Sequence, residues 1–328
     1  MAKISIVIPT YNAEKTIHQC LEALFALETP DLEVIIVDDA SSDKTVETAQ
    51  KFPCKIIHSS ENKGPAYSRL IGLKEATADM VVFIDSDILV GKDTFSELLA
   101  AFSTYTDAVV IVGMLSKKHP NKNFFSQYKN LYMHYIFSKC PTQIDFIYGS
   151  FYAVKKKCYD FIPLNKRYAE DTEVGMHLAQ CGFKIILEKK LQVIHLKKYS
   201  FISFIKNDFI IPFYWARLFL QSKGWKVVKR EKRFYHSPKE QLISVVLAPI
   251  VLITLFLNPW LAALLIVAQF LANIRFFIFL NREKGLLFTL SSIAITWVDW
   301  VTMSSGIICG FCTFLLLTKK MHLARFFT

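Results

Sequence analysis

Met80-Val-Val-Phe-Ile-Asp-Ser-Asp87 joins a wholly apolar run to two acidic residues, a combination that indicates the class of fold. A strand as apolar as Met80–Ile84 is normally buried on both faces, as in a parallel sheet covered by helices. Ligands of such sheets bind at the carboxyl ends of the strands. Because side chains alternate along extended backbone, we expect Asp85 and Asp87 to point to the same side of a ligand site.

The two carboxylates flank one small residue, Ser86, and supply hard oxygen atoms. Oxygen ligands of this kind suit Mg²⁺ or Mn²⁺, held jointly with the phosphates of a substrate. A D-x-D pattern occurs by chance in many chains, so its meaning depends on the residues around it.

Strands and helices alternate through the first 90 residues. The predicted strands are Ile4–Ile8, Leu32–Val37, Lys55–His58 and Met80–Ile84, and the predicted helices are Ala13–Leu27, Ser42–Phe52 and Ala66–Ala76. This order predicts right-handed βαβ units in an α/β, doubly wound, Rossmann-like sheet. We therefore expect a nucleotide-binding half-domain.

Residues 91–200 are less regular. Predicted helices cover Thr94–Phe102 and Asn123–Phe137, and predicted strands cover Ala108–Met114, Phe146–Val154, Lys184–Leu187 and Leu191–His195. We expect this part to form the acceptor side of a two-part site. The seven cysteines are irregularly spaced, which argues against a disulfide framework and suits a reducing compartment.

The charge is distributed unevenly along the chain. Residues 1–90 contain 8 basic and 14 acidic side chains, whereas residues 201–328 contain 15 and 5. Mean hydropathy is +0.30, and the apolar residues concentrate after Gln241. A basic excess beside apolar segments favours anionic lipid or phosphate as partner, and no nucleic-acid-binding motif accompanies it.

The C-terminal part is predicted to contact a membrane. Phe201–Leu220 reads as an amphipathic helix lying in the interface, and a basic run follows it over residues 223–233. Three apolar stretches then reach spanning length, namely Gln241–Leu257, Trp260–Leu280 and Leu286–Leu317. The expected organisation is a catalytic domain over 1–200, an interfacial and juxtamembrane segment over 201–239, and about three spans over 240–328.

Basic residues also predict the orientation of these spans. Arg282 and Lys284 place the 281–285 linker, together with the catalytic domain, in the cytoplasm. Three spans would leave the basic tail outside, so either the larger basic block upstream overrules the tail or the last stretch folds back as a short hairpin near Asp299–Gly306. Met1-Ala-Lys3 runs straight into a strand, so we expect no signal peptide. Arg275 and Asp299 would lie at membrane depth. In one interpretation Arg275 snorkels to the interface and Asp299 makes a contact within the membrane; in the other, the two residues form a pocket for a lipid phosphate.

Five motifs occur together in a fixed order. They are Ile4-Ser-Ile-Val-Ile-Pro-Thr-Tyr-Asn12, Val37-Asp-Asp-Ala-Ser-Ser-Asp-Lys-Thr45, Asn62-Lys-Gly-Pro-Ala66 with Arg69, Phe83-Ile-Asp-Ser-Asp87 and Ala169-Glu-Asp-Thr-Glu173. This set resembles the family 2 glycosyltransferases, which have a GT-A fold, over roughly residues 1–200. The resemblance implies a nucleotide-sugar donor and a divalent metal ion, Mg²⁺ or Mn²⁺.

The resemblance also implies roles for individual residues. Asp39 would contact the base, Asp87 would be the direct metal ligand, and Asp85 would lie nearer the ribose and metal. His195 is a further candidate ligand of the metal or the diphosphate, and the alternative for it is a structural role. Arg69 is a candidate for binding the diphosphate, and the alternative for it is a surface ion pair. The whole expected donor site comprises Pro9, Thr10, Tyr11, Asp38, Asp39, Gly64, Arg69, Asp85 and Ser86.

Glu170-Asp171 resembles the E-D motif of the family. By that resemblance Asp171 is the catalytic base, which deprotonates the acceptor hydroxyl as it attacks the sugar, and Glu170 tunes or orients it. One base opposite the leaving group implies a single displacement with inversion. The alternative is that these acids complement the dipole at a helix N-terminus, and both roles can hold.

One departure from the family pattern concerns the acceptor. Processive members carry Q-x-x-R-W on an interfacial helix, whereas this chain has Phe213-Tyr-Trp-Ala-Arg217-Leu. We therefore expect a single addition to a lipid or lipid-linked glycan rather than long-chain synthesis. Arg217, Lys229 and Arg230 are the candidates for holding the acceptor phosphate or lipid.

The sequence thus predicts a multi-pass membrane glycosyltransferase with a UDP- or GDP-sugar donor. One alternative is an enzyme that glycosylates a polyprenyl phosphate, where phosphate is the nucleophile and no strong base is needed. Another is a catalytically inactive scaffold that binds lipid. A nucleotidyltransferase is disfavoured, because Pro9-Thr-Tyr-Asn12 stands where a glycine-rich loop would be.

Overall fold

The computed structural model describes the chain except for residues 1–3, 28–31, 162–169, 222–235 and 327–328. The chain divides into two compact units. Unit 1 contains Met1–Lys122 and Phe137–Lys198, and unit 2 contains Asn123–Ile136 and Tyr199–Thr328. Helix α5 (Phe124–Lys139) contributes residues to both.

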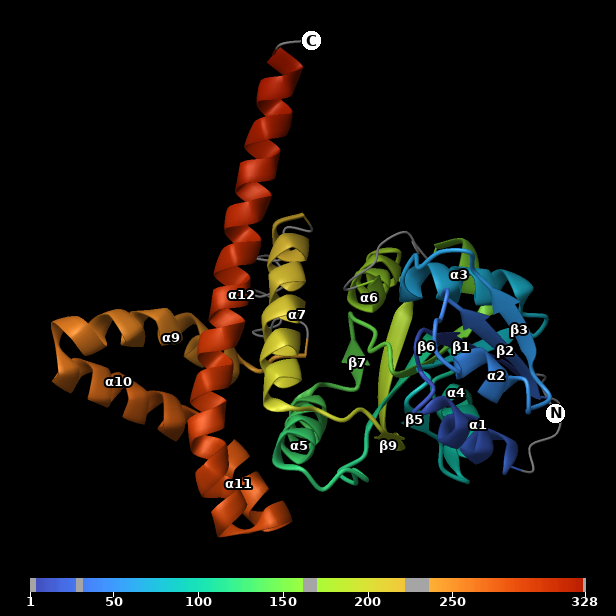
Figure 1. Cartoon of the computed structure of the whole chain (residues 1–328), viewed down its shortest axis with the longest axis horizontal. Helices are drawn as coiled ribbons and strands as arrows, with labels where there is room; N and C mark the ends of the chain where they lie inside the picture. The colour runs from blue at the N-terminus through green and yellow to red at the C-terminus, as the bar shows by residue number, and fades with distance from the viewer. Residues whose placement is uncertain (1–3, 28–31, 162–169, 222–235, 327–328) are drawn as a thin grey trace. The chain divides into compact units, whose positions relative to one another are not determined.

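Unit 1 begins with the parallel half of a sheet. Strands β1 (Ile4–Thr10), β2 (Leu32–Asp38), β3 (Lys55–His58) and β4 (Met80–Ile84) pair in the order β3-β2-β1-β4, all parallel. Helices α1 (Ile17–Phe25), α2 (Thr45–Ala49) and α3 (Pro65–Glu75) connect these strands (Figure 1). Val81, Val82 and Phe83 of β4 are fully buried, which confirms the doubly wound half predicted from their apolarity.

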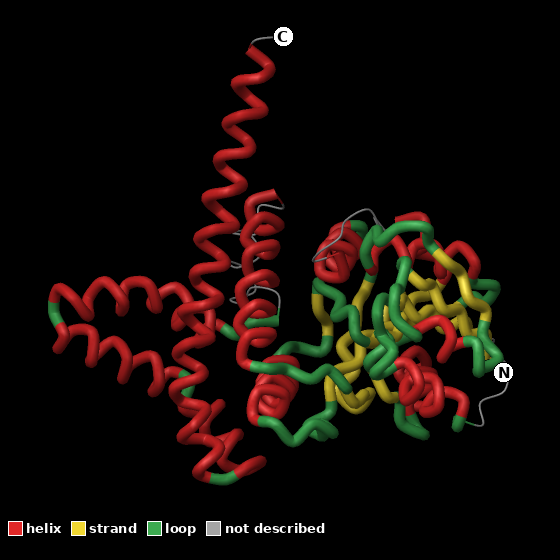
Figure 2. Tube along the Cα trace, viewed as in Figure 1, coloured by secondary structure: helices red, strands yellow, loops and turns green. Residues whose placement is uncertain are grey.

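The second half of the sheet is mixed. Strand β8 (Phe151–Lys155) lies antiparallel between β4 and β6 (Ala108–Leu115), and β9 (Lys184–His195) runs parallel to β6. Two short strands, β5 (Ile88–Leu89) and β7 (Gln143–Ile144), pair with β9 and complete nine strands. Figure 2 shows this sheet with helices around it, including α4 (Thr94–Thr104), the 3-10 helix η1 (Lys156–Phe161) and α6 (Glu170–Gln180).

Three details of unit 1 correct the sequence predictions. The strand predicted over Phe146–Val154 begins only at Phe151, because residues 146–150 form a loop beside α6. The two strands predicted over Lys184–Leu187 and Leu191–His195 are one continuous strand, β9. Strands β5 and β7 were not predicted, because each has two residues and depends on pairing with the distant β9.

Unit 2 contains long apolar helices. They are α7 (Phe201–Gln221), α9 (Lys239–Leu257), α10 (Pro259–Ala272), α11 (Ile274–Lys284) and α12 (Leu286–Phe326). Among the described residues, Lys239–Leu257 and Leu286–Leu316 are long and apolar enough to cross a membrane, and a bent pair formed by α10 and α11 is a third candidate. The bend is 60°, so the segment predicted as one span over Trp260–Leu280 is two helices.

Helices α7 and α12 lie side by side at backbone distance (Figure 1). A Cβ atom added at Gly306 would lie 2.3 Å from the carbonyl oxygen of Phe209, and one at Gly310 would lie 2.4 Å from that of Phe213. Small residues four positions apart allow this close approach, as in many membrane helix pairs.

Unit 2 also buries a group of charged residues. Lys129 Nζ of α5 forms an ion pair with Asp208 Oδ1 of α7, and both side chains are at most 10% exposed. Asp299 of α12 is 1% exposed and interacts electrostatically with both. Asp299 therefore has protein partners inside unit 2, in line with the interpretation of this residue as an intramembrane contact. Arg275 lies exposed on α11.

Candidate functional site

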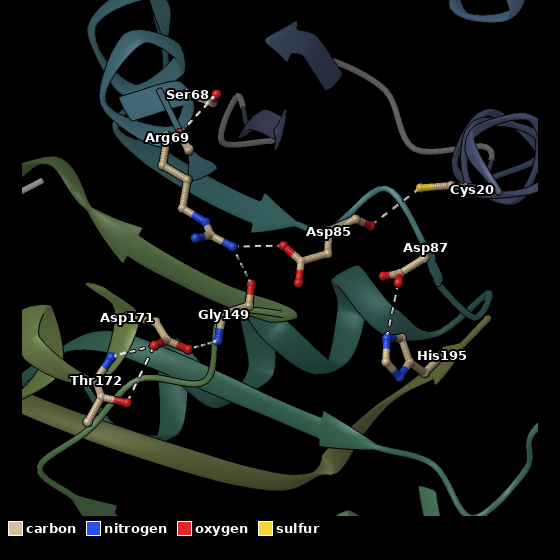
Figure 3. Close-up of polar contacts among 10 residues, drawn as sticks. Cys20, Ser68, Arg69, Asp85, Asp87, Gly149, Asp171, Thr172 and His195 are labelled. Carbon is tan, nitrogen blue, oxygen red and sulfur yellow. Dashed lines mark hydrogen bonds and ion pairs between the residues drawn. The ribbon is translucent and has the colours of Figure 1, made fainter. Parts of the chain in front are cut away.

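The site lies in unit 1, where the parallel strands end. Thr10 at the end of β1 pairs in register with Asp38 at the end of β2, and Asp85 directly follows β4. Since β1 lies between β2 and β4, these three residues reach the same edge of the sheet. Figure 3 shows how Asp85 and Asp87 approach Arg69, Gly149, Asp171 and His195 at this edge.

Asp85 is held by an arginine from α3. Arg69 Nη2 lies 2.7 Å from Asp85 Oδ1 and also donates to the carbonyl oxygen of Gly149 at 3.4 Å. Arg69 is only 3% exposed, so this charge is fixed in place. Burial raises the pKa of Asp85 above its usual value, while the positive charge of Arg69 acts in the opposite direction. The surface ion pair considered for Arg69 is thus excluded, because its partner lies inside the site.

Asp87 pairs with the histidine predicted to join it. The Nε2 atom of His195 lies 3.2 Å from Asp87 Oδ2. The pairing of Ile88 with His195 brings the ends of β5 and β9 together. Burial opposes ionisation of Asp87, but His195 and, more weakly, Lys197 hold the pKa of Asp87 below its usual value. Two neighbouring acids therefore have their pKa values pushed in opposite directions.

Asp171 lies in the first turn of α6 and faces the same region (Figure 3). Its Oδ2 accepts a hydrogen bond from the backbone N–H of Gly149 at 2.8 Å, and its Oδ1 accepts one from the N–H of Thr172 at 2.7 Å. The Gly149 peptide thus contacts Asp171 through its N–H and Arg69 through its carbonyl oxygen. The predicted metal-binding side and the predicted base are joined through this one residue.

The donor atoms present suit a divalent ion. Asp85 and Asp87 each use one oxygen in an ion pair and keep the other as a hard ligand. Among the described residues, no group of three or more His, Cys, Asp or Glu side chains is gathered as a metal site. Mg²⁺ commonly binds through one or two carboxylates plus substrate phosphates, so a two-carboxylate arrangement fits an ion bound together with a diphosphate.

The predicted nucleotide end is shaped by two aspartates. Asp39 accepts hydrogen bonds from the backbone N–H groups of Lys63 and Gly64 at 2.9 and 2.7 Å, so it holds the turn before α3. Gly64 has φ of 93°, a left-handed conformation that favours glycine. Asp38 is buried and its Oδ1 has no hydrogen-bond partner among the described residues, which leaves an acceptor for a ligand N–H or hydroxyl group.

The first motif, Ile4–Asn12, ends at this edge of the sheet. Thr10 is buried and its Oγ1 donates to the carbonyl oxygen of Val37, whereas Tyr11 is 52% exposed and available to a ligand. Asn12 does not cap α1, because its side chain accepts a hydrogen bond from the N–H of Ser42. Pro9 lies within buried β1, and Ser86 lies half-buried between the two acids.

The geometry of unit 1 does not test the remaining predicted residues. Arg217 lies on α7 in unit 2, with its guanidinium 6.0 Å from the ring centre of Phe213. Lys229, Arg230 and the side chain of Glu170 lie outside the part of the chain that the structure describes. These roles stay predictions.

Two nearby residues were not predicted from the sequence. Gly149 was missed, although a glycine ahead of a strand is a known sign of close backbone approach. Cys20 Sγ lies 3.8 Å from the carbonyl oxygen of Asp85. Burial, with the charges of Asp87 and Asp85, raises the pKa of the Cys20 thiol to about 12, so it stays protonated and is a poor nucleophile.

Comparison with known proteins identifies the family of the domain that contains this candidate site. Residues 5–162 match the family model "Glycosyl transferase family 2". The chain is 33% identical over 121 residues to poly(ribitol-phosphate) beta-N-acetylglucosaminyltransferase TarS of Staphylococcus aureus, and 29% identical over 192 residues to dolichol-phosphate mannosyltransferase of Pyrococcus furiosus. These alignments cover 35% and 57% of this chain but only 21% and 51% of the relatives.

A solved structure shares the fold over most of the chain. It is a mannosyltransferase from Pyrobaculum calidifontis in complex with GDP-Man and Mn²⁺, with a TM-score of 0.58 and 17% identity. The similarity covers 96% of this chain and 87% of that one, and at this identity it shows the fold alone. The mixed sheet is thus of the GT-A type that the sequence motifs led us to expect. Residues 5–162 of this chain therefore form a glycosyl transferase family 2 domain.

Proposed function

We propose that the protein is a metal-dependent, inverting glycosyltransferase that acts at the cytoplasmic face of a membrane. It takes a sugar from a UDP- or GDP-activated donor and passes it to a lipid or lipid-linked acceptor. The observation that carries the proposal is the convergence of Asp85, Asp87 and Asp171 at one edge of the sheet, with Arg69 and Gly149 between them.

The donor would lie along the carboxyl ends of the strands. Asp38 and Asp39 stand at the nucleotide end, and the exposed ring of Tyr11 offers an apolar face for the base. Asp85 and Asp87 would hold Mg²⁺ or Mn²⁺, which offsets the charge of the diphosphate leaving group. Arg69 is buried beside Asp85, where its charge favours the diphosphate as well.

Asp171 supplies the base on the acceptor side. An acceptor hydroxyl attacks the anomeric carbon, its proton passes to Asp171, and the bond from that carbon to the diphosphate oxygen breaks. The electron pair leaves with the nucleoside diphosphate, and a single displacement inverts the anomeric centre. The hydrogen bonds from Gly149 and Thr172 orient the carboxylate for this transfer.

A hairpin formed by α9 and α10 supports attachment to a membrane (Figure 1). Its tip carries Phe256, which is 90% exposed, and Trp260, which is 87% exposed, and lipid is the solvent that suits such surfaces. Exposed Lys239 and Arg275 lie near the open end, where they would meet anionic headgroups. With 14 residues, α10 is shorter than the roughly 20 residues that a straight span needs.

A second candidate is glycosylation of a polyprenyl phosphate, favoured by the similarity to a dolichol-phosphate mannosyltransferase. Here a phosphate oxygen is the nucleophile and needs no strong base. The Asp171→Asn variant distinguishes the two, measured as nucleoside diphosphate release with either a polyprenyl phosphate or a hydroxyl-bearing lipid extract as acceptor. We expect a loss of about 100-fold or more with the hydroxyl acceptor, whereas retention of most activity with the phosphate acceptor would favour the second candidate.

A further inference from the structure

Gly149 lies between the two sides of the candidate site (Figure 3). A Cβ atom added there would lie 3.1 Å from Arg69 Nη2 and 3.1 Å from Asp171 Oδ2. Both distances are tighter than ordinary van der Waals contact, so a larger residue would displace one of the two charged groups. At the observed spacing, a side chain at residue 149 would require Arg69 or Asp171 to shift by a few tenths of an ångström.

A second glycine fixes the helix that carries Asp171. Gly175 lies four residues after Asp171 on α6, and residues with this spacing share one helix face. A Cβ atom added at Gly175 would lie 2.4 Å from the backbone nitrogen of Ile147 and 2.4 Å from the carbonyl carbon of Phe146. Here α6 rests directly on the main chain of the loop that leads to Gly149, and the atoms in the way are backbone atoms that cannot rotate aside.

We propose that Gly149 and Gly175 are positioning residues that set the place of the Asp171 carboxylate, a role that rests on the proposed function of Asp171. Gly175 sets how closely α6 approaches the loop over residues 146–149, and Gly149 then fixes the carboxylate by its N–H group. Because the Gly149 carbonyl also accepts from Arg69, the same loop relates the base to the Asp85 side of the site.

The geometry predicts the size of the effect. An ordinary contact for a Cβ atom begins at 3.4 Å, so alanine at Gly175 requires α6 and the loop to separate by about 1 Å. A displacement of about 1 Å at a reacting group can lower the rate by about 100-fold. The donor side is held by β1, β2, β4 and α3, which Gly175 does not contact among its nearest atoms. The variant should therefore lose turnover and keep donor binding.

The test compares Gly175→Ala and Gly149→Ala with Gly91→Ala in the full-length protein. Gly91 is the matched control, because an added Cβ atom meets its nearest neighbour, Thr94 Oγ1, at 3.7 Å. The readouts are kcat for nucleoside diphosphate release, the donor KM and the Tm, with UDP-GlcNAc or GDP-mannose and Mn²⁺ as donor probes and a hydroxyl-bearing lipid extract as acceptor. We expect Gly175→Ala to lower kcat by about 100-fold with a donor KM changed by less than about threefold, and Gly91→Ala to change neither.

A rescue separates positioning from a general loss of structure. The double variant Gly175→Ala/Asp171→Glu carries a longer acid that bridges the added gap, and we expect it to regain part of kcat. If Gly175→Ala does not fold, kcat, donor KM and Tm are compared between Gly149→Ala and Gly91→Ala instead.

Unchanged kcat in both glycine variants, or equal losses of donor binding and kcat without rescue, would overturn the positioning role. A wild-type protein that releases no nucleoside diphosphate from any donor refutes the proposed function itself, and the catalytic role of both glycines with it.

Discussion

Arg69 Nη2 lies 2.7 Å from Asp85 Oδ1, which joins the start of α3 to the end of β4 at the candidate site. The arginine side chain is 4% exposed and the aspartate side chain 33% exposed, so the pair lies at the boundary between core and site. The Arg69 guanidinium is thus shielded from water, whereas the Asp85 carboxylate stays open to a ligand. Because Asp85 offsets the charge of Arg69, the pair would repel a metal ion at Asp85 less than an isolated arginine would.

Loss of Arg69 should destabilise unit 1. The variant Arg69→Met leaves the Asp85 carboxylate without its cation, and breaking a partly buried pair costs about 1 to 3 kcal/mol of unfolding free energy. The double variant Arg69→Met/Asp85→Asn should recover part of the loss. Chemical unfolding followed by circular dichroism measures both. Lys55→Met is the control, because Lys55 pairs with Glu75 on the surface and such pairs contribute about 0 to 1 kcal/mol. Equal losses of unfolding free energy in Arg69→Met and Lys55→Met would contradict a stabilising role for the Arg69–Asp85 pair.

Asp43 should make stability depend on pH at the acid end. Slight burial acts to raise the pKa of Asp43, but hydrogen bonds from the backbone N–H groups of Thr45 and Glu14 lower that pKa below 3.8. A lowered folded-state pKa gives stability that is present above pH 3.8 and disappears as the pH falls through the folded value. We expect Asp43→Ala to cost about 1 kcal/mol at pH 7, as for loss of a helix cap, and nothing once the carboxyl is protonated.

Urea unfolding at pH 7 and at pH 2.5 or so measures this difference. Glu47→Ala on the same helix is the control, and its effect should not follow the Asp43 profile. A difference between wild type and Asp43→Ala that persists unchanged in acid would show that the carboxylate charge is not the cause.

The buried charges of unit 2 should respond unequally to substitution. Asp208→Asn leaves Lys129 buried without its counter-ion, which typically costs about 3 to 5 kcal/mol. Asp299→Asn removes a second carboxylate whose two oxygens have no hydrogen-bond partner among the described residues, so we expect a neutral or stabilising change. The Tm of each variant in detergent measures this, and a larger fall for Asp299→Asn than for Asp208→Asn would contradict the assignment of Lys129 to Asp208.

Trp260 should report insertion of the α9–α10 hairpin into lipid. The chain has five tryptophans, of which Trp300 is 1% exposed whereas Trp260 is 87% exposed at the hairpin tip. In vesicles with brominated acyl chains, we expect strong quenching of the wild-type fluorescence and a clear loss of quenchable signal in Trp260→Phe. Trp300→Phe is the control. Equal quenching in wild type and Trp260→Phe would place the hairpin tip outside the bilayer.

The sequence predicted the parallel half of unit 1 because its strands are short, apolar and separated by amphipathic helices. It also predicted Asp85, Asp87 and Asp171 as a group, through motifs rather than through geometry. It did not predict β5, β7 or the extent of β9, because pairing between residues distant in sequence decides them.

The contacts within the site depended on the fold in the same way. Nothing local distinguishes an Arg69 on the surface from one paired with Asp85, and only the packing of α3 on the sheet decides between them. The close backbone contacts of Gly149 and Gly175 could not be predicted from the sequence, because they depend on how α6 packs against the main chain of the 146–149 loop.

The proposed function requires that the site bind a nucleotide sugar together with a divalent metal ion. Thermal unfolding of the full-length protein is followed with UDP-GlcNAc, GDP-mannose and a CDP-sugar, each with and without Mn²⁺, for wild type and for Asp85→Asn/Asp87→Asn. We expect a UDP- or GDP-sugar to raise the Tm of wild type only when Mn²⁺ is present. The double variant should start from a lower Tm, because Arg69 and His195 lose their carboxylate partners, and should show no such shift from its own ligand-free value. No shift with any nucleotide sugar, or the same shift in the double variant, would contradict the proposed function.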